Sequence, residues 1–150
     1  MPQSLSLAIV HVVFSTKDRQ CFLNPEIRAA LHSYLAKVVR SAGCECYRIG
    51  GVEDHVHFAI RLSRTITIAD LVEKLKAPSS KWLKSQADDL RDFAWQRGYG
   101  CFSVGPKDLK ALIDYIDRQP EHHRQQTFQE EFRMLLERCG AKYDEAYVWD

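Results

Sequence analysis

A stretch in the middle of the chain alternates hydrophobic residues with other types, which is the period of a β-strand. It covers residues 52–62 and contains His55-Val56-His57. Residues 44–49 also have the composition of a strand, and Gly50-Gly51 is typical of a tight bend or bulge. We therefore expect the two strands to pair as a hairpin inside an antiparallel sheet.

The hairpin places two imidazoles side by side, because residues two apart in a strand share a face. His55 and His57 could then bind one divalent metal, although partly buried histidines are also common without a metal. Alternation directs Asp54 away from this face, which favours a structural role. His11 interrupts the apolar run 7–14, a predicted central strand, and could approach the pair if the strands are neighbours.

Two amphipathic helices are predicted in the first two thirds of the chain. The first has Asn24 as its cap and Pro25 at its first position, and it ends at Gly43. The second begins at Thr67, which has the position of a cap. Pro78 removes a backbone hydrogen bond and is expected to kink or divide this helix.

A third helix begins at Gly105-Pro106 and carries a hydrophobic stripe. Tyr115 and Gln119 lie one turn apart on one flank of that stripe, so a phenol and a carboxamide can reach the same site. Spacing alone favours an ordinary half-buried packing role for the tyrosine. Pro120 disfavours helical backbone at Gln119, so the helix should end or kink there.

The last helix is predicted from a capping box formed by Thr127 and Glu130, and it ends at Gly140. The C-terminal residues 143–150 are too aromatic for a disordered tail and are expected to pack on the body. With the strands described above, this order of elements suits an α+β fold, a ferredoxin-like (RRM-like) antiparallel sheet with helices packed on it.

The composition is that of one soluble domain. The chain has 150 residues, of which 45% are hydrophobic and 27% charged, enough to form a core without disulfides. Its five cysteines are an odd number without Cys-x-x-Cys spacing, which favours reduced thiols. There is no signal-peptide pattern and no stretch of transmembrane length, so we expect a cytoplasmic protein with no membrane partner.

The charge is balanced, with 21 basic and 20 acidic residues, so any surface for nucleic acid must be local. The predicted second helix has the densest basic segment, which suits phosphate contacts but also an ordinary solvated face. Residues 93–104 are aromatic, with Gly98 and Gly100 between two expected short strands, and exposed rings there could stack on unpaired bases. Candidate nucleic-acid contacts are Lys74, Lys81, Lys84 and Arg97.

The His55-Val56-His57 strand and the later pair Tyr115 and Gln119 resemble the marks of the single-tyrosine HUH transposases, in that order along the chain. These enzymes move bacterial insertion sequences and repetitive extragenic elements as single-stranded DNA. The sequences of residues 95–104 and 121–124 also resemble those of the family. The resemblance extends from about His11 to the C-terminus and describes residues 1–150 as one single-tyrosine HUH transposase domain.

The resemblance implies an endonuclease and transposase that cleaves and rejoins single-stranded DNA through a 5′-phosphotyrosine intermediate, at ends that carry a hairpin. Tyr115 would be the nucleophile, and His55, His57 and Gln119 would be the metal ligands. Two imidazoles and an amide oxygen suit octahedral Mg²⁺ or Mn²⁺. A homodimer is implied in which the tyrosine helix of one chain could complete the partner's site. His11, His122 and His123 receive no assigned role.

Two other function classes compete with this interpretation. Ferredoxin-like sheets can bind nucleic acid on surface aromatics without catalysis, so a non-catalytic or domesticated binding module is the alternative. A zinc hydrolase is less favoured, because no glutamate stands in a His-x-x-x-His or His-x-Glu pattern.

Overall fold

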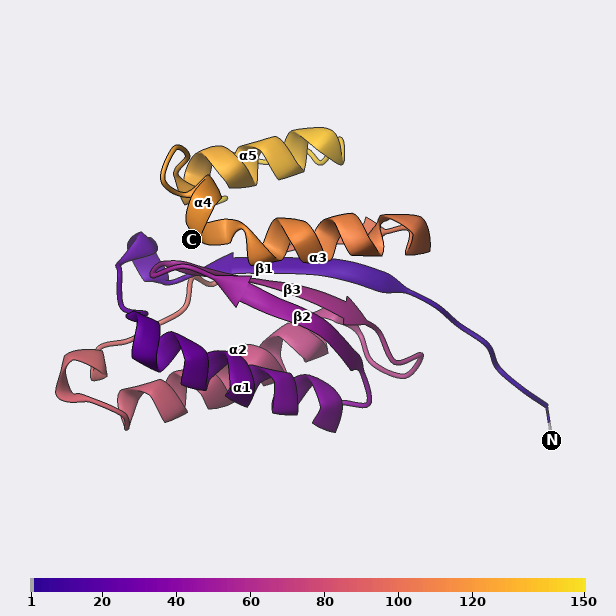
Figure 1. Ribbon diagram of the computed structural model, residues 1–150, viewed down its shortest axis with the longest axis horizontal. Coiled ribbons are helices and arrows are strands. Elements are labelled where there is room, and N and C mark those ends of the chain that lie inside the picture. The colour runs from indigo at the N-terminus through magenta and orange to yellow at the C-terminus, as the bar shows by residue number, and fades with distance from the viewer. Residues whose placement is uncertain (1) are drawn as a thin grey trace.

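The computed structural model describes residues 2–150, and a four-stranded antiparallel sheet lies at its centre (Figure 1). The order across the sheet is β2-β3-β1-β4. The strands are β1 (Ile9–Ser15), β2 (Glu45–Gly51), β3 (His55–Arg61) and β4 (Gly100–Val104). This arrangement confirms the predicted α+β sheet, with β1 and the histidine strand β3 as direct neighbours at its centre.

Helices cover both faces of the sheet (Figure 1). One face packs against α1 (Pro25–Ser41) and α2 (Ile68–Lys84), and the other against α3 (Leu109–Asp117) and α5 (Phe128–Arg138), with the short α4 (Gln119–His122) between them. All seven residues of β1 are buried. This explains why β1 has a continuous apolar run rather than an alternating pattern.

The predicted helix caps are present. The Asn24 side chain accepts a hydrogen bond from the Ile27 amide, and Thr67 and Thr127 cap α2 and α5 in the same way. The expectation that Pro78 divides the second helix is wrong, because α2 continues through it to Lys84. Pro78 is exposed, so water can hydrate the carbonyl that the proline leaves without a donor.

The expected hairpin is formed by β2 and β3, but its turn lies at residues 52–54 rather than at Gly50-Gly51. Gly50 is instead required for close packing. A Cβ atom at this position would lie 2.6 Å from Ile116 Cγ2 and 2.8 Å from the Ile116 carbonyl oxygen. The glycine therefore lets the end of α3 lie directly on the sheet beside the histidine strand.

The third and fifth helices divide one face of the sheet between them. α3 packs on β2 and β3 through Leu112 and Ile116, and α5 packs on β1 and β4 through Phe128, Phe132 and Leu136. The inner face of β3 thus faces the space between the two helices.

The C-terminal segment packs on α5, as predicted. The Trp149 ring lies 5.9 Å from the Phe132 ring between centroids, and Arg133 forms two hydrogen bonds to Glu145. The aromatic stretch 93–104 differs from the prediction, since it forms one strand, β4. Its first part contributes a single bridge between Thr16 and Trp95.

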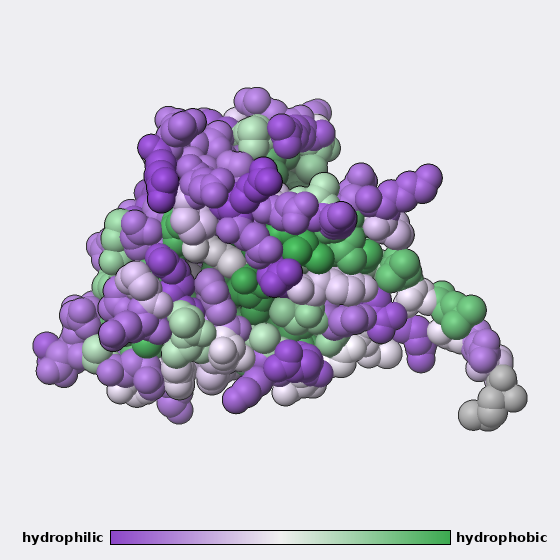
Figure 2. Space-filling model, viewed as in Figure 1, coloured by the Kyte–Doolittle hydropathy of each residue, from purple (hydrophilic) through white to green (hydrophobic). Residues whose placement is uncertain are grey.

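The surface is mostly polar on the face in Figure 2, with hydrophobic side chains along the arm that leads to the N-terminus. Leu5 and Leu7 of this arm are 87% and 54% exposed. All five cysteines are free. Across residues 2–150, none of the helices combines the length and the apolar character that crossing a membrane requires.

Candidate metal and nucleophile site

The two histidines of β3 lie side by side as predicted, and both side chains are fully buried. They face the layer formed by α3 and α5. Val56 between them belongs to the hydrophobic core on the opposite face of the sheet. The core on one side of the strand thus fixes the direction of the imidazoles on the other.

His11 joins this pair from the neighbouring strand. Its Nε2 lies 2.7 Å from His57 Nδ1, and the two rings stack with their centroids 5.0 Å apart. Burial, together with the nearby His57, lowers the pKa of His11 to about 3, so the ring is neutral. A hydrogen bond at Nδ1 fixes the orientation of the His57 ring, so that its Nε2 faces α5.

Asp54 acts on the other histidine, which corrects the expectation that it points away. Its Oδ1 lies 2.7 Å from His55 Nδ1. Strand alternation does not apply to Asp54, because β3 begins at His55 and Asp54 belongs to the preceding turn. A carboxylate on Nδ1 orients the ring and increases the basicity of Nε2, as seen for histidines that bind metals.

The structure brings Tyr115 and Gln119 to the histidines within the same chain. The Gln119 Oε1 lies 2.9 Å from His55 Nε2, and the Tyr115 ring centroid is 5.9 Å from that of His57. Gln119 is buried and Tyr115 is half-buried. The predicted end of the helix is confirmed, since α3 ends at Asp117, but Gln119 itself is helical, as the first residue of α4.

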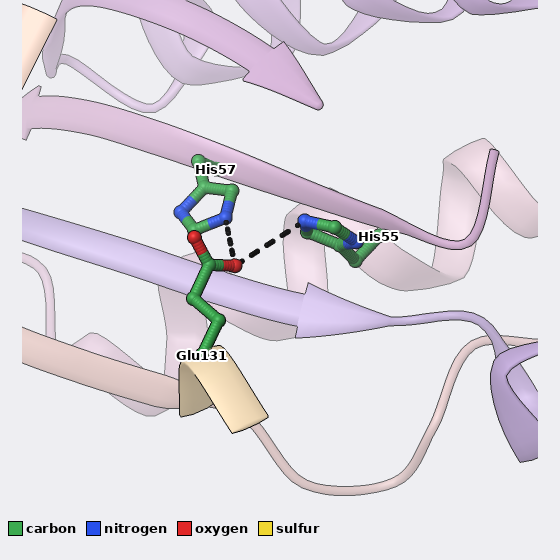
Figure 3. Close-up of side chains that lie close together, drawn as sticks. All are labelled: His55, His57 and Glu131. Carbon is green, nitrogen blue, oxygen red and sulfur yellow. Dashed lines mark hydrogen bonds and ion pairs between the residues drawn. The ribbon is translucent and has the colours of Figure 1, made fainter. Parts of the chain in front are cut away.

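One more group, Glu131 of α5, lies at the centre of the cluster, and the sequence prediction missed it. Its carboxylate is fully buried, and Figure 3 shows both β3 imidazoles directed at one of its oxygens. That Oε1 atom lies 3.1 Å from His57 Nε2, 3.4 Å from His55 Nε2 and 3.1 Å from His123 Nε2. The other oxygen accepts hydrogen bonds from Gln119 Nε2 and the Tyr115 hydroxyl.

One sequence signal could have revealed this glutamate. Glu131 follows Phe128 by three positions and directly precedes Phe132, so it lies within the apolar stripe that docks α5. A buried carboxylate in such a stripe requires partners.

The charges in the cluster compensate one another. Burial alone would raise the pKa of the Glu131 carboxyl, but hydrogen bonds from His123, His55 and His57 hold it far below its usual range. Burial opposes a proton on His55, yet bonds to Asp54 and Glu131 raise its pKa to about 9. Burial and the Glu131 charge raise the pKa of the Tyr115 phenol. The cluster thus pairs a carboxylate with a protonated imidazole.

The donor atoms of the cluster suit a divalent cation. Ligand atoms of His55, His57 and Glu131 all lie within 4.8 Å of one another. A cavity of about 420 Å³ borders the cluster and is lined by Asp54, His123 and Phe128 among others. It gives solvent a route to the edge of the site.

The predicted basic contacts lie elsewhere. Lys74, Lys81 and Lys84 are exposed on α2, on the opposite side of the sheet from the histidines, and Arg97 lies in the loop before β4. Lys76 of the same helix donates to the carbonyls of residues 96–98 and so holds this loop. The structure does not bring these cations to the histidine cluster.

The chain is similar in sequence to known transposases. Residues 4–119 match the sequence profile of the family described as "Transposase IS200 like". Over 125 residues, the chain is 32% identical to the transposases for insertion sequence element IS200 of Salmonella typhimurium and Salmonella typhi, covering 76% of this chain and 78% of each relative.

Two solved structures share the fold. A putative transposase from Deinococcus radiodurans has a TM-score of 0.62 at 21% identity, over 79% of this chain and 98% of the other. A REP-associated tyrosine transposase bound to a REP hairpin also has a TM-score of 0.62, at 16% identity, over 82% of this chain and 72% of the other. The extent of the profile match and the identity to the Salmonella proteins show that the chain belongs to the IS200-like transposase family.

Proposed function

We propose that this protein is a metal-dependent enzyme that cleaves and rejoins single-stranded DNA through a 5′-phosphotyrosine intermediate. Tyr115 is the nucleophile, and His55, His57 and Gln119 hold Mg²⁺ or Mn²⁺. One observation carries the proposal: the phenol and the carboxamide, distant from the histidines in sequence, share a single buried carboxylate with both of them.

The chemistry assigned to the chain's own residues is simple. The Tyr115 oxygen attacks phosphorus in line and forms the phosphotyrosine bond, while the 3′ oxygen leaves as a hydroxyl. A bound divalent cation would neutralise charge on the phosphate and orient the leaving group. Asp54 and His11 orient the two imidazoles through their Nδ1 atoms.

Rejoining is the reverse of the same step. A 3′ hydroxyl attacks the phosphotyrosine, restores a phosphodiester and returns the phenol to Tyr115. No nucleotide cofactor is required, because the covalent bond to the protein conserves the energy of the broken one. The half-buried position of the Tyr115 ring beside His57 limits the access of water to that bond.

The substrate we propose is single-stranded DNA whose ends carry a hairpin. The fold is shared with a tyrosine transposase bound to a REP hairpin, which supports a structured end rather than a plain strand. Since its substrate is DNA of the cell, we expect the protein to act in the cytoplasm. A homodimer remains part of the proposal, and the exposed Leu5 and Leu7 provide apolar surface for contact between chains.

The test is covalent capture of a single-stranded oligonucleotide that carries a hairpin end, in the presence of Mn²⁺. The Tyr115→Phe variant should bind this DNA and form no adduct that survives denaturation. Tyr147→Phe is the control, because Tyr147 is 70% exposed and lies outside the cluster. An undiminished adduct from Tyr115→Phe would refute the mechanism, and metal-independent binding without any cleavage would favour the non-catalytic module.

A further inference from the structure

The spacing of donor atoms around Glu131 is that of a coordination sphere. An octahedral ion with ligands at ~2.0–2.1 Å places neighbouring ligand atoms about 3 Å apart. Glu131 Oε1 lies 3.1 Å from His57 Nε2 and 3.4 Å from His55 Nε2, and Gln119 Oε1 lies 2.9 Å from His55 Nε2. Three pairs among these four potential ligands therefore already have the separation of adjacent octahedral positions.

We propose that Glu131 is a direct ligand of the divalent cation, added to the histidines of β3, so that helix α5 completes the metal site. This inference rests on the proposed function for the presence of the ion. Glu131 lies beyond residues 4–119, which match the family's sequence profile, so this match does not include the proposed ligand.

Charge supports a carboxylate in this position. Two neutral imidazoles and a carboxamide bring no negative charge to a divalent cation, whereas hard ions such as Mg²⁺ and Mn²⁺ prefer anionic oxygen. Glu131 supplies one such oxygen to the histidines. Its second oxygen accepts hydrogen bonds from Gln119 Nε2 and the Tyr115 hydroxyl, and so orients the nucleophile toward the ion.

A ligand on α5 has a consequence for the whole C-terminal segment. This helix is held on the sheet by Phe128, Phe132 and Leu136, and the residues after it pack on its outer side. If the ion binds Glu131, then ion binding and docking of α5 must stabilise each other by the same free energy. Hydrogen exchange in residues 128–138 should therefore slow when Mn²⁺ is added.

The decisive experiment measures Mn²⁺ affinity directly, by calorimetry or by the loss of the free-ion signal in electron paramagnetic resonance, without DNA. Glu131→Gln keeps the shape of the side chain and removes its charge. Loss of an outer partner of a metal ligand weakens binding by about 10–100-fold, so loss of a direct ligand should cost at least tenfold. Glu137→Gln on the same helix is the matched control, because Glu137 is exposed, and it should bind as the parent chain does.

The outcomes separate this inference from the proposed function. If Glu131→Gln binds Mn²⁺ as well as the parent chain or better, the carboxylate is only an internal counter-ion of His55 and the inference is wrong. If the parent chain binds no Mn²⁺, or His55→Ala binds it equally well, the proposed metal-dependent function fails first. Should Glu131→Gln not fold, Glu131→Asp applies the same test, since it withdraws the oxygen by one methylene and should also bind more weakly.

Discussion

The contact between Gly50 and Ile116 allows a direct test of whether the position of α3 sets the activity. In Gly50→Ala the new methyl group would lie 2.6 Å from Ile116 Cγ2 and 2.8 Å from the Ile116 carbonyl oxygen. Ordinary contacts between carbon atoms are ~3.5–4.0 Å. The end of α3 must therefore retreat by roughly 1 Å, because one of the two obstacles is backbone.

The displaced segment carries both groups that meet the histidines. Ile116 lies between Tyr115 and Gln119, so a shift of the helix moves the phenol and the carboxamide away from β3. A misplacement of about 1 Å can cost on the order of 100-fold in rate. Overpacking of this kind typically destabilises a protein by ~1–3 kcal/mol. The fold should therefore survive with a lower melting temperature.

The assay is the rate of covalent adduct formation with hairpin DNA, with thermal unfolding and DNA binding measured on the same samples. Gly50→Ala should bind DNA but cleave it about 10- to 100-fold more slowly. Gly105→Ala is the control, because its Cβ would meet only the flexible Asp108 carboxylate, at 3.2 Å. Cleavage by Gly50→Ala at the parent rate would refute the claim that close packing of α3 on β2 sets the site.

Three further predictions follow from the same structure. The site groups meet within one chain, so mixing Tyr115→Phe with His57→Ala should restore no cleavage, and restored activity would show a site shared between chains. Asp54→Asn should weaken Mn²⁺ binding by about 10–100-fold in titrations, because it removes the carboxylate on His55 Nδ1. Burial, with the nearby Arg28, lowers the pKa of His32 to about 4, so the unfolded chain binds the extra proton and stability falls between about pH 6.5 and pH 4. The check is denaturant unfolding at both pH values: between about pH 6.5 and pH 4, the unfolding free energy of His32→Leu should fall by on the order of 2–3 kcal/mol less than that of the parent chain.

The elements that the sequence predicted well are those with a local cause. The Asn24, Thr67 and Thr127 caps are set by a side chain and an amide three residues away, so their helices begin where expected. The alternation of β3 likewise fixes which face His55 and His57 share. These interactions involve residues that are close in sequence, so they can be predicted without knowledge of the fold.

The predictions that failed are those in which tertiary contacts outweighed a local sequence preference. Pro78 does not divide α2, because packing of the helix on the sheet compensates for one missing hydrogen bond. Asp54 turns toward His55, because β3 begins at His55 rather than at the predicted residue 52, so that Asp54 lies in the preceding turn. Glu131 could not be assigned, since its partners are 8 to 76 residues away and depend on where α5 docks.

The buried carboxylate also sets a condition for the metal binding proposed above. An ionised group in the interior is tolerated only beside a compensating positive charge. In this cluster, a protonated His55 supplies that charge: its Nδ1–H donates to the Asp54 carboxylate, and its Nε2 faces Glu131. A divalent cation bound by Glu131 and His55 would therefore displace the Nε2 proton and leave the Nδ1 proton hydrogen-bonded to Asp54, because His55 can bind metal only through a deprotonated Nε2. The Nε2 proton and the proposed metal ion would thus compensate the charge of Glu131 in turn.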